Sequence, residues 1–384
     1  MVARPAEFFA ATAPGLEPLC QMELEALSLN ASQESITTGG VTFTGHLQDC
    51  YTANLCLRTA NRILMRISVF KASNFHTLKK NLAEFPWELY LLPGSLPHLQ
   101  IATHRSRLHH SGAIAERFRD GITHRWSHMG IETGKSSDEV RYQRLFVRAY
   151  NDIFTVSLDS SGDNLYRRGL KKDVTAAPLR ETLAAAILIL AKYTPPEPLV
   201  DPMCGAGSFS LEAAMQAHNI PAGWFRDFMF YKWPAFNITS KRWEYIRKRR
   251  QQRFSEKTTA AIFATDIDPA ACQTLERNSK AAGLSQTIRV VSRDFFDLVP
   301  DKLSRTPGLV TINAPFGRRL GSLEQSDRLF EKLFDSLKNK WRGWKVGLVI
   351  PRQSLLKKVP FSTTPLTIRH GGLHLYLVTG RMAD

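Results

Sequence analysis

The sequence predicts an α/β protein in which a doubly wound parallel sheet follows an α+β first half. Two observations support this prediction. After the Pro-rich segment "TPPEP" (194–198), short apolar runs alternate with helical segments, as in parallel sheets covered by helices. Before residue 160, short strand-like runs mix with amphipathic helices, which is typical of α+β units built on an antiparallel sheet.

The first half contains five predicted strands and two predicted helices. Gly, Asn and Ser bound the strand-like runs, which are "GGVTFTG" (39–45), "RILMRISVF" (62–70), "HLQIATH" (98–104), "RLFVRAY" (144–150) and "IFTVSLDSSG" (153–162). Apolar residues recur at helical spacing in "GLEPLCQMELEAL" (15–27) and "SGAIAERFRDGITHRW" (111–126).

The second half alternates strands with helices. A buried helix is predicted at "LAAAILILA" (183–191), which is too short to span a bilayer. Predicted strands begin at "LVDPM" (199–203), "AIFATDID" (261–268), "IRVVSRD" (288–294), "GLVTIN" (308–313) and "KVGLVIP" (345–351). Helices are predicted at 208–218, 269–283 and 326–341, and "LTIRHGGLHLYLVTG" (366–380) predicts an antiparallel hairpin turned at Gly371-Gly372.

Composition limits the class of protein. A chain of 384 residues predicts two or three domains, and five scattered cysteines without a Cys-x-x-Cys pair predict reduced thiols in the cytoplasm and no metal site. The start is a poor signal peptide, and no membrane or protein partner is indicated. The net charge of +16 predicts a polyanionic partner, with nucleic acid as the first choice. Basic residues cluster at 166–172, 247–253, 316–320 and 338–342, and 219–260 form a long basic and aromatic insertion.

The stretch "DPMCGAGS" follows the first predicted parallel strand and opens a helix. Gly205 and Gly207 allow a tight turn with room for a ligand, whose anionic group a helix N-terminus favours. Ser210 stands where a dinucleotide-binding fingerprint has its third glycine, and Asp266 lies far beyond the usual distance of about 20 residues. A nicotinamide cofactor is therefore disfavoured.

Acidic residues follow the next two predicted strands. Asp266 is expected to accept hydrogen bonds from both hydroxyls of a ribose, whereas Asp268, before Pro269, is expected to cap a helix. Asp294 could receive an adenine amino group, and Phe295 could flank the ring. A glycine turn followed by two such carboxylates describes an adenosine-bearing ligand with a small charged tail.

These motifs carry a family resemblance. "DPMCGAG" with "NAPF" (313–316) resembles class I S-adenosylmethionine-dependent methyltransferases that act on planar exocyclic amines. The stretches "VSLDSSGDNLYRRGLKKDVTAAPLRETLAAAIL", "NIPAGWFRDFMFYKWPAF" and "ATDIDPAACQTLERN" are similar to THUMP-domain RNA guanine-N2 methyltransferases of the bacterial large-ribosomal-RNA (RlmL-like) type. The resemblance implies a ferredoxin-like domain at 1–65, a THUMP RNA-binding domain at 66–165, and a Rossmann-like methyltransferase domain at 166–384. It also implies a seven-stranded sheet that ends in an antiparallel hairpin.

The same resemblance implies the site residues. S-adenosylmethionine would contact Asp201, Cys204, Gly205, Ala206, Gly207, Asp266, Ile267, Asp294 and Phe295. The catalytic loop would be Asn313, Ala314, Pro315 and Phe316, with the Asn313 amide and the Ala314 carbonyl accepting the hydrogens of the target amine and Phe316 stacking on the base. Two positions depart from the family pattern, since Ala314 replaces a proline and Ala206 replaces a serine.

Three functions remain open from the sequence. The first is a cytoplasmic RNA methyltransferase acting on guanine N2 in 23S ribosomal RNA. The second is an adenine-N6 methyltransferase on RNA or DNA, because the same loop can hold either amine. The third is an RNA-binding protein with a catalytically silent methyltransferase fold, which Ala314 supports and the intact acidic and glycine positions oppose.

Overall fold

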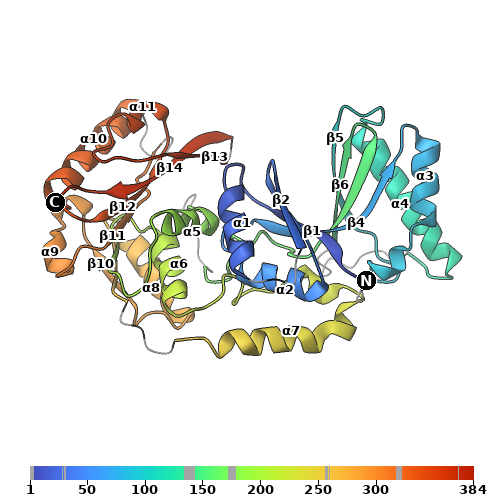
Figure 1. Cartoon of the computed structure of the whole chain (residues 1–384), viewed down its shortest axis with the longest axis horizontal. Helices are drawn as coiled ribbons and strands as arrows, with labels where there is room; N and C mark the ends of the chain where they lie inside the picture. Colours follow the sequence, from blue (N-terminus) through green and yellow to red (C-terminus); the bar gives the residue numbers. More distant parts are fainter. Residues whose placement is uncertain are drawn as a thin grey trace.

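Two seven-stranded sheets lie side by side along the long axis of the molecule (Figure 1). The computed structural model describes residues 4–27, 29, 32–133, 143–171, 179–255, 258, 260–316, 322–370 and 372–384. In these residues no helix is long and apolar enough to cross a membrane. The first half of the chain forms one sheet and the second half forms the other, as predicted.

The chain begins with a βαββαβ unit. Its elements are β1 (Ala6–Ala11), α1 (Glu17–Ala26), β2 (Ser32–Thr37), β3 (Gly40–Gly45), α2 (Leu47–Cys56) and β4 (Arg62–Lys71). The strands lie in the order β2-β3-β1-β4, which is the ferredoxin-like arrangement. The sequence did not indicate β1, β2 or α2.

The second part of the first half extends the same sheet. Its elements are α3 (Phe75–Glu84), the 3₁₀-helix η1 (Trp87–Leu89), β5 (His98–His104), α4 (Ser111–His128), β6 (Arg144–Tyr150) and β7 (Ile153–Asp159). Strand β4 pairs with β1 near its start and with β7 along most of its length, so the predicted boundary at residue 65 falls within a shared strand. The expected antiparallel pattern is wrong at one place, because β5 and β6 are parallel: the chain crosses over between them through α4.

The second half has the predicted doubly wound sheet in the order β10-β9-β8-β11-β12-β14-β13. Strands β8 to β12 are parallel, while β14 pairs antiparallel with β12 and β13. The strands are β8 (Leu199–Asp201), β9 (Ile262–Asp266), β10 (Ile288–Ser292), β11 (Leu309–Ile312), β12 (Lys345–Ile350), β13 (Leu366–His370) and β14 (Leu373–Arg381). Gly371 of the expected hairpin turn lies outside the described residues, and Gly372 has a φ of +81°.

Helices cover this second sheet. The helical elements are α5 (Glu181–Leu190), α6 (Ser208–Ala217), η2 (Met229–Lys232), α7 (Phe236–Gln251), α8 (Pro269–Ala281), η3 (Phe295–Asp297), α9 (Pro300–Leu303), α10 (Leu323–Lys340) and α11 (Gln353–Leu356). The predicted buried helix at 183–191 is α5, of which every residue from Thr182 to Leu188 is buried.

The insertion between α6 and β9 packs on the first half of the chain. Phe230 stacks on Tyr51 of α2 with 4.3 Å between ring centroids, and Trp243 meets the same tyrosine edge-on. The Tyr51 hydroxyl shares a 2.7 Å hydrogen bond with the Thr239 hydroxyl of α7. These aromatic side chains belong to the hydrophobic core of the first half, so the insertion joins the two halves.

A buried ion cluster forms a second joint. Glu212 of α6 is 1% exposed and accepts hydrogen bonds from Arg58 Nη1 (2.5 Å) and Arg168 Nε (3.3 Å). Arg58 Nη2 also donates to the carbonyl of Ile220 at 2.6 Å. Burial alone would raise the pKa of Glu212, but the charges of Arg168 and Arg58 lower it overall.

This cluster generates a stability prediction. Glu212→Ala should lower the free energy of unfolding by about 3–5 kcal/mol, because it leaves the buried Arg168 and the partly buried Arg58 without their counter-charge. Urea unfolding followed by circular dichroism measures the change. Glu331→Ala is the control, since the Glu331–Lys358 pair is solvent-exposed and should contribute little. Equal losses in the two variants would show that the cluster does not hold the halves together.

Candidate functional site

The loop between β8 and α6 depends on two glycines in the left-handed region. Gly205 has a φ of +52° and Gly207 a φ of +82°, a conformation that other residues rarely adopt. A Cβ atom on Gly207 would lie 2.2 Å from Leu275 Cδ1 of α8, so glycine is also required for packing. The loop therefore turns sharply and leaves its backbone open on the side away from α8.

Asp266, at the end of β9, holds this loop in place. Its Oδ2 accepts a hydrogen bond from the Gly205 backbone N–H at 2.9 Å, and its Oδ1 accepts one from the Asp268 N–H at 3.0 Å. The remaining lone pairs of the half-buried carboxylate are available to a ligand. Asp268 caps α8 by accepting from the Ala270 N–H at 2.9 Å, which confirms the predicted cap.

Asp201 is buried beneath the loop. It is 1% exposed and accepts hydrogen bonds from the Ser210 N–H (3.2 Å) and hydroxyl (2.7 Å). Burial raises the pKa of Asp201 to about 7 and the charge of Asp266 adds to this rise, whereas the bonds from Ser210 oppose it. Asp201 therefore positions the start of α6, and Ser210 is explained by this hydrogen bonding.

The end of β10 supplies a second carboxylate. Asp294 is half-buried and accepts from the Phe296 N–H at 3.0 Å. Phe295 is 1% exposed and stacks on Trp341 with 5.8 Å between centroids, so it offers a ligand little surface. The half-buried Phe296, with Lys332 Nζ 3.8 Å from its ring centroid, is the more available of the two rings.

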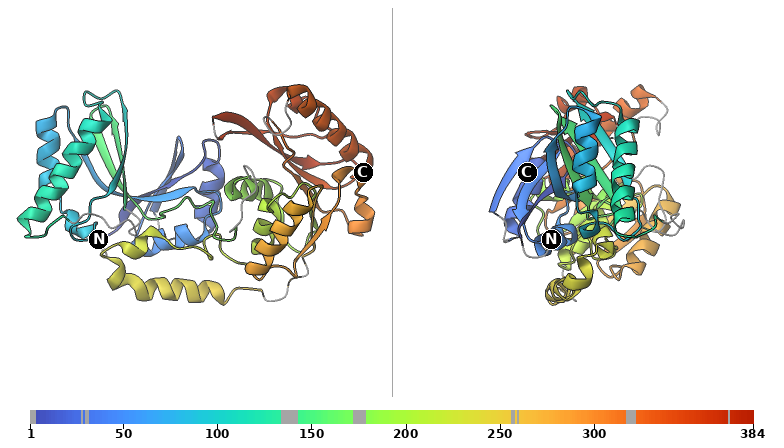
Figure 2. Two further views of the ribbon diagram at one scale, coloured as in Figure 1. Left: turned by 180° about the vertical axis from the view of Figure 1, so that it is seen from behind. Right: turned by 90° about the vertical axis from the view of Figure 1, so that its right-hand side faces the viewer.

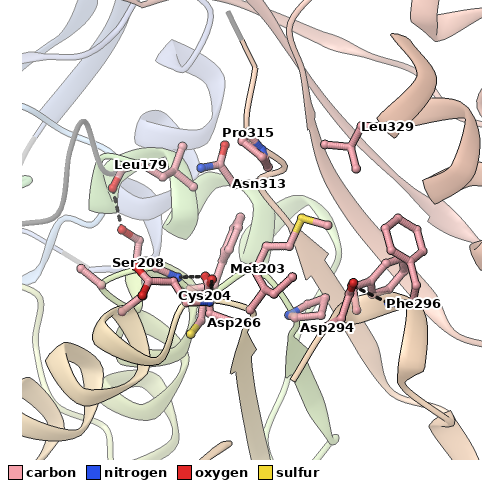
Figure 3. Close-up of a pocket in the computed structure, with 18 residues that line it drawn as sticks. Leu179, Met203, Cys204, Ser208, Asp266, Asp294, Phe296, Asn313, Pro315 and Leu329 are labelled. Atoms are coloured by element: carbon pink, nitrogen blue, oxygen red, sulfur yellow. Dashed lines mark hydrogen bonds between the residues drawn. The ribbon is translucent and has the colours of Figure 1, made fainter. Parts of the chain in front are cut away.

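These strand ends surround a cavity of about 680 Å³ (Figure 3). Asn313 and Pro315, after β11, lie across it from Asp266 and Asp294. The predicted site residues that line it are Cys204, Gly205, Ala206, Asp266, Ile267, Asp294, Phe295, Asn313 and Pro315. The sequence missed Leu179, Pro202, Met203, Ser208, Phe209, Ala271, Phe296 and Leu329, and gave Asp268 only a capping role.

Four predicted site residues do not line the cavity. Asp201 lies beneath the loop between β8 and α6, and Gly207, within that loop, packs against Leu275 of α8. Ala314 is 1% exposed and lies in the core that β11 forms with α10 and β12. Phe316 is half-buried against a cluster that includes Leu179, so its stacking on a base remains a prediction. Residues 317–320, which include two arginines of the basic cluster, lie outside the described residues.

The side-chain amide of Asn313 is available to a ligand in the cavity. The side chain is half-buried, and no hydrogen bond joins its amide to any part of the chain that the structure describes.

The thiol of Cys204, which also lines the cavity, is buried. A hydrogen bond with Cys272 together with burial raises the pKa of this thiol, so it is unsuited to act as a nucleophile. Among the described residues no cluster of histidine, cysteine or acidic side chains could hold a metal ion.

Two regions of the chain match known protein families. The RMKL-like methyltransferase domain matches residues 168–363, and the RlmL ferredoxin-like domain matches residues 7–64. A Synechocystis sp. protein named as an RNA methyltransferase is 30% identical over 370 residues, which cover 95% of this chain and 94% of that protein.

A ribosomal RNA large subunit methyltransferase K/L of Syntrophotalea carbinolica is 31% identical over 392 residues, covering 99% of this chain and 54% of that protein. The chain spans about half the length of the K/L relatives that it matches.

Solved structures share the fold along almost the whole chain. SMU.472, described as a methyltransferase complexed with SAH, superposes with a TM-score of 0.86 at 24% identity and covers 100% of this chain and 99% of its own. A Listeria monocytogenes protein, described as an N6-adenine-specific DNA methylase, has a TM-score of 0.84 at 26% identity, with coverage of 97% and 96%. The arrangement of both sheets is therefore shared with these solved structures.

Proposed function

The chain belongs to the family of RMKL-like methyltransferases, and from this premise we propose that it methylates an exocyclic nucleobase amine in RNA with S-adenosylmethionine. In its most specific form, the proposed target is guanine N2 of 23S ribosomal RNA, which would place the protein in the cytoplasm. The names of the K/L relatives support ribosomal RNA as the substrate class. We also propose that residues 66–165 form the THUMP domain that helps to bind this RNA.

The cavity fits the proposed cofactor. Its volume of about 680 Å³ lies within the usual range for small-ligand sites, about 300–1,000 Å³. Asp266 offers carboxylate acceptors for ribose hydroxyls, Asp294 offers one for an adenine amino group, and the start of α6 favours the carboxylate of the amino-acid tail. When bound, S-adenosylmethionine supplies an electrophilic methyl group on a sulfonium sulfur.

The Asn313 amide, which has no hydrogen-bond partner among the described residues, is the observation that carries the proposal. A nucleobase amine is a poor nucleophile because its lone pair is delocalised into the ring. An oxygen acceptor fixed at the cavity wall holds the amine N–H and orients its nitrogen, so that positioning and electrostatics lower the barrier. The Ala314 carbonyl is the proposed second acceptor, and Pro315 restricts the backbone between them and Phe316.

Adenine N6 is the alternative target, and the Listeria monocytogenes structure is the observation that favours it. The same acceptor pair suits an adenine amine. The relatives named as RNA methyltransferases favour RNA over DNA as the substrate, whereas the basic clusters suit either nucleic acid. The catalytically silent alternative leaves the cavity and its open Asn313 amide without a purpose.

The nucleoside product tests the proposal. The protein should transfer labelled methyl groups from S-adenosylmethionine to protein-free 23S ribosomal RNA transcribed in vitro. Nuclease digestion and mass spectrometry should then reveal N2-methylguanosine. Detection of N6-methyladenosine would establish the alternative. If the protein binds S-adenosylmethionine but leaves the transcript unmethylated, the proposed substrate is wrong.

The cofactor site predicts an effect of Asp266→Ala. Affinity for S-adenosylmethionine should fall roughly 5- to 150-fold, equivalent to about 1–3 kcal/mol, because a buried set of hydrogen bonds loses its acceptor and Gly205 is released. Isothermal titration calorimetry measures the change. Asp268→Ala is the comparison, since it removes a helix cap and should affect stability more than affinity. The reverse pattern would assign the ribose to Asp268.

The catalytic loop predicts an effect of Asn313→Ala. Single-turnover methylation at saturating cofactor should slow on the order of 10²–10³-fold, because one preorganised partner of the reacting amine is lost. Cofactor affinity should hardly change. Asn339→Ala, an exposed position on α10, is the matched control and should react at the parental rate. A fast Asn313→Ala variant would remove this residue from the mechanism.

A further inference from the structure

The outer face of α7 carries a stripe of four cationic side chains together with one isoleucine and one tyrosine. The stripe residues recur at helical spacing on one face, and all are exposed: Ile238, Lys241, Arg242, Tyr245, Lys248 and Arg249. Figures 1 and 2 show α7 along the lower edge of the molecule, joined at one end to the insertion on the first half and at the other to the methyltransferase half. Over the 16 residues of α7 this face extends about 24 Å.

The inner face of α7 fixes the orientation of the stripe. Trp243 and Thr239 are buried in the core of the first half. The Arg247 guanidinium lies over the Trp224 ring at 4.3 Å from its centroid. This contact holds the C-terminal half of α7 against the start of the insertion. The apolar side of α7 is therefore already occupied, and the stripe is held outward.

Among the described residues, no ion pair neutralises the positive charge of the stripe. Glu244 is the one acidic residue in the α7 sequence, and in the described part of the chain no ion pair involves a stripe residue. Lys248 and Arg249 lie in the last turn, where cations complement the helix dipole, but Lys241 and Arg242 lie well before it. Solubility alone does not explain Tyr245, which is 64% exposed among these cations.

We propose that the stripe binds the phosphate backbone of the RNA substrate, with Tyr245 stacking on an unpaired base. This inference rests on the proposed function, in which the substrate is RNA. Four cations on one helix, without an ion-pair partner in the described part of the chain, match closely spaced phosphates. An aromatic ring between cations is the usual combination for unpaired nucleotides. A lipid surface fits less well, because membrane-surface helices need a broad free apolar face and that face of α7 is buried.

A charge-neutralised variant tests the electrostatic part. Glutamine keeps a good helix propensity, so α7 should remain folded. The stripe variant combines Lys241→Gln, Arg242→Gln, Lys248→Gln and Arg249→Gln. The matched control removes two exposed lysines and two exposed arginines outside the basic clusters, by Lys302→Gln, Arg305→Gln, Lys357→Gln and Arg289→Gln.

Binding to full-length 23S ribosomal RNA transcript is measured by filter retention between about 50 and 200 mM salt. The stripe variant should bind about 100-fold more weakly, and its slope of log affinity against log salt should be smaller by about 3–4, roughly 1 per lost phosphate contact. The control variant should behave like the parent protein. Cofactor affinity and the thermal midpoint should be the same in all three proteins.

Tyr245→Ala tests the stacking part. It should weaken binding roughly 5- to 100-fold, because a base loses its aromatic partner, while the salt slope stays at the parental value. Unchanged affinity of the Tyr245→Ala variant for the RNA would overturn the stacking role.

Three outcomes would overturn the inference: parental RNA binding by the stripe variant, an equal loss in the control variant, or stripe-dependent binding to phosphatidylglycerol vesicles with none to RNA. A parent protein that binds RNA but does not methylate it would contradict the proposed function alone. In that case a selective loss of binding in the stripe variant would still support the RNA-binding role of α7.

Discussion

The hydrogen bond between the Gly205 backbone and the Asp266 carboxylate is the contact on which the cavity depends. Strands β8 and β9 are parallel, with Asp201 opposite Ala264, so the loop after β8 starts beside the end of β9. The left-handed conformation of Gly205 then turns its N–H toward Asp266. A shift of one residue in this pairing would turn the Asp266 side chain to the other face of the sheet and open the loop.

Helix α6 connects this loop to the first half of the chain. Its first turn begins with Ser208, which lines the cavity, and Glu212, one turn later, accepts hydrogen bonds from Arg58 and Arg168. Because residues four positions apart lie on the same side of a helix, one rigid element carries both contacts. An RNA held by the first half or by α7 would therefore have a defined position relative to Asn313.

The sequence predicted the second sheet because its elements follow one another locally. Each apolar run ends at a polar residue and precedes a helix, and parallel strands bring those ends to one edge. The first half was harder to predict, since β1 and β2 show little alternation of apolar and polar residues. The parallel pairing of β5 with β6 also joins segments that the whole of α4 separates in the chain. Local pattern did not reveal that partner.

The positions of the strand ends predicted where the candidate site lies. They did not predict which of its side chains are buried. The sequence placed Asp201 and Phe295 with the ligand, yet packing against Ser210 and Trp341 makes them mainly supports. Leu179 and Leu329 come from segments without any motif and reach the cavity through tertiary packing alone. The periodicity of apolar residues shows which segments meet at an edge of the sheet. Whether a given side chain lines the cavity or packs in the core depends on the volumes of side chains from several elements.

Ala314 illustrates this difference between a sequence pattern and its packing. As a departure from the family proline, it was the one feature in favour of a catalytically silent protein. In the structure it is 1% exposed in the core between β11 and α10, where contacts restrain it without a ring. Pro315 follows it directly, limits its backbone to extended conformations and itself lines the cavity. The rigidity that a proline would give the loop is thus supplied by burial and by the next residue, which argues against loss of activity at this position.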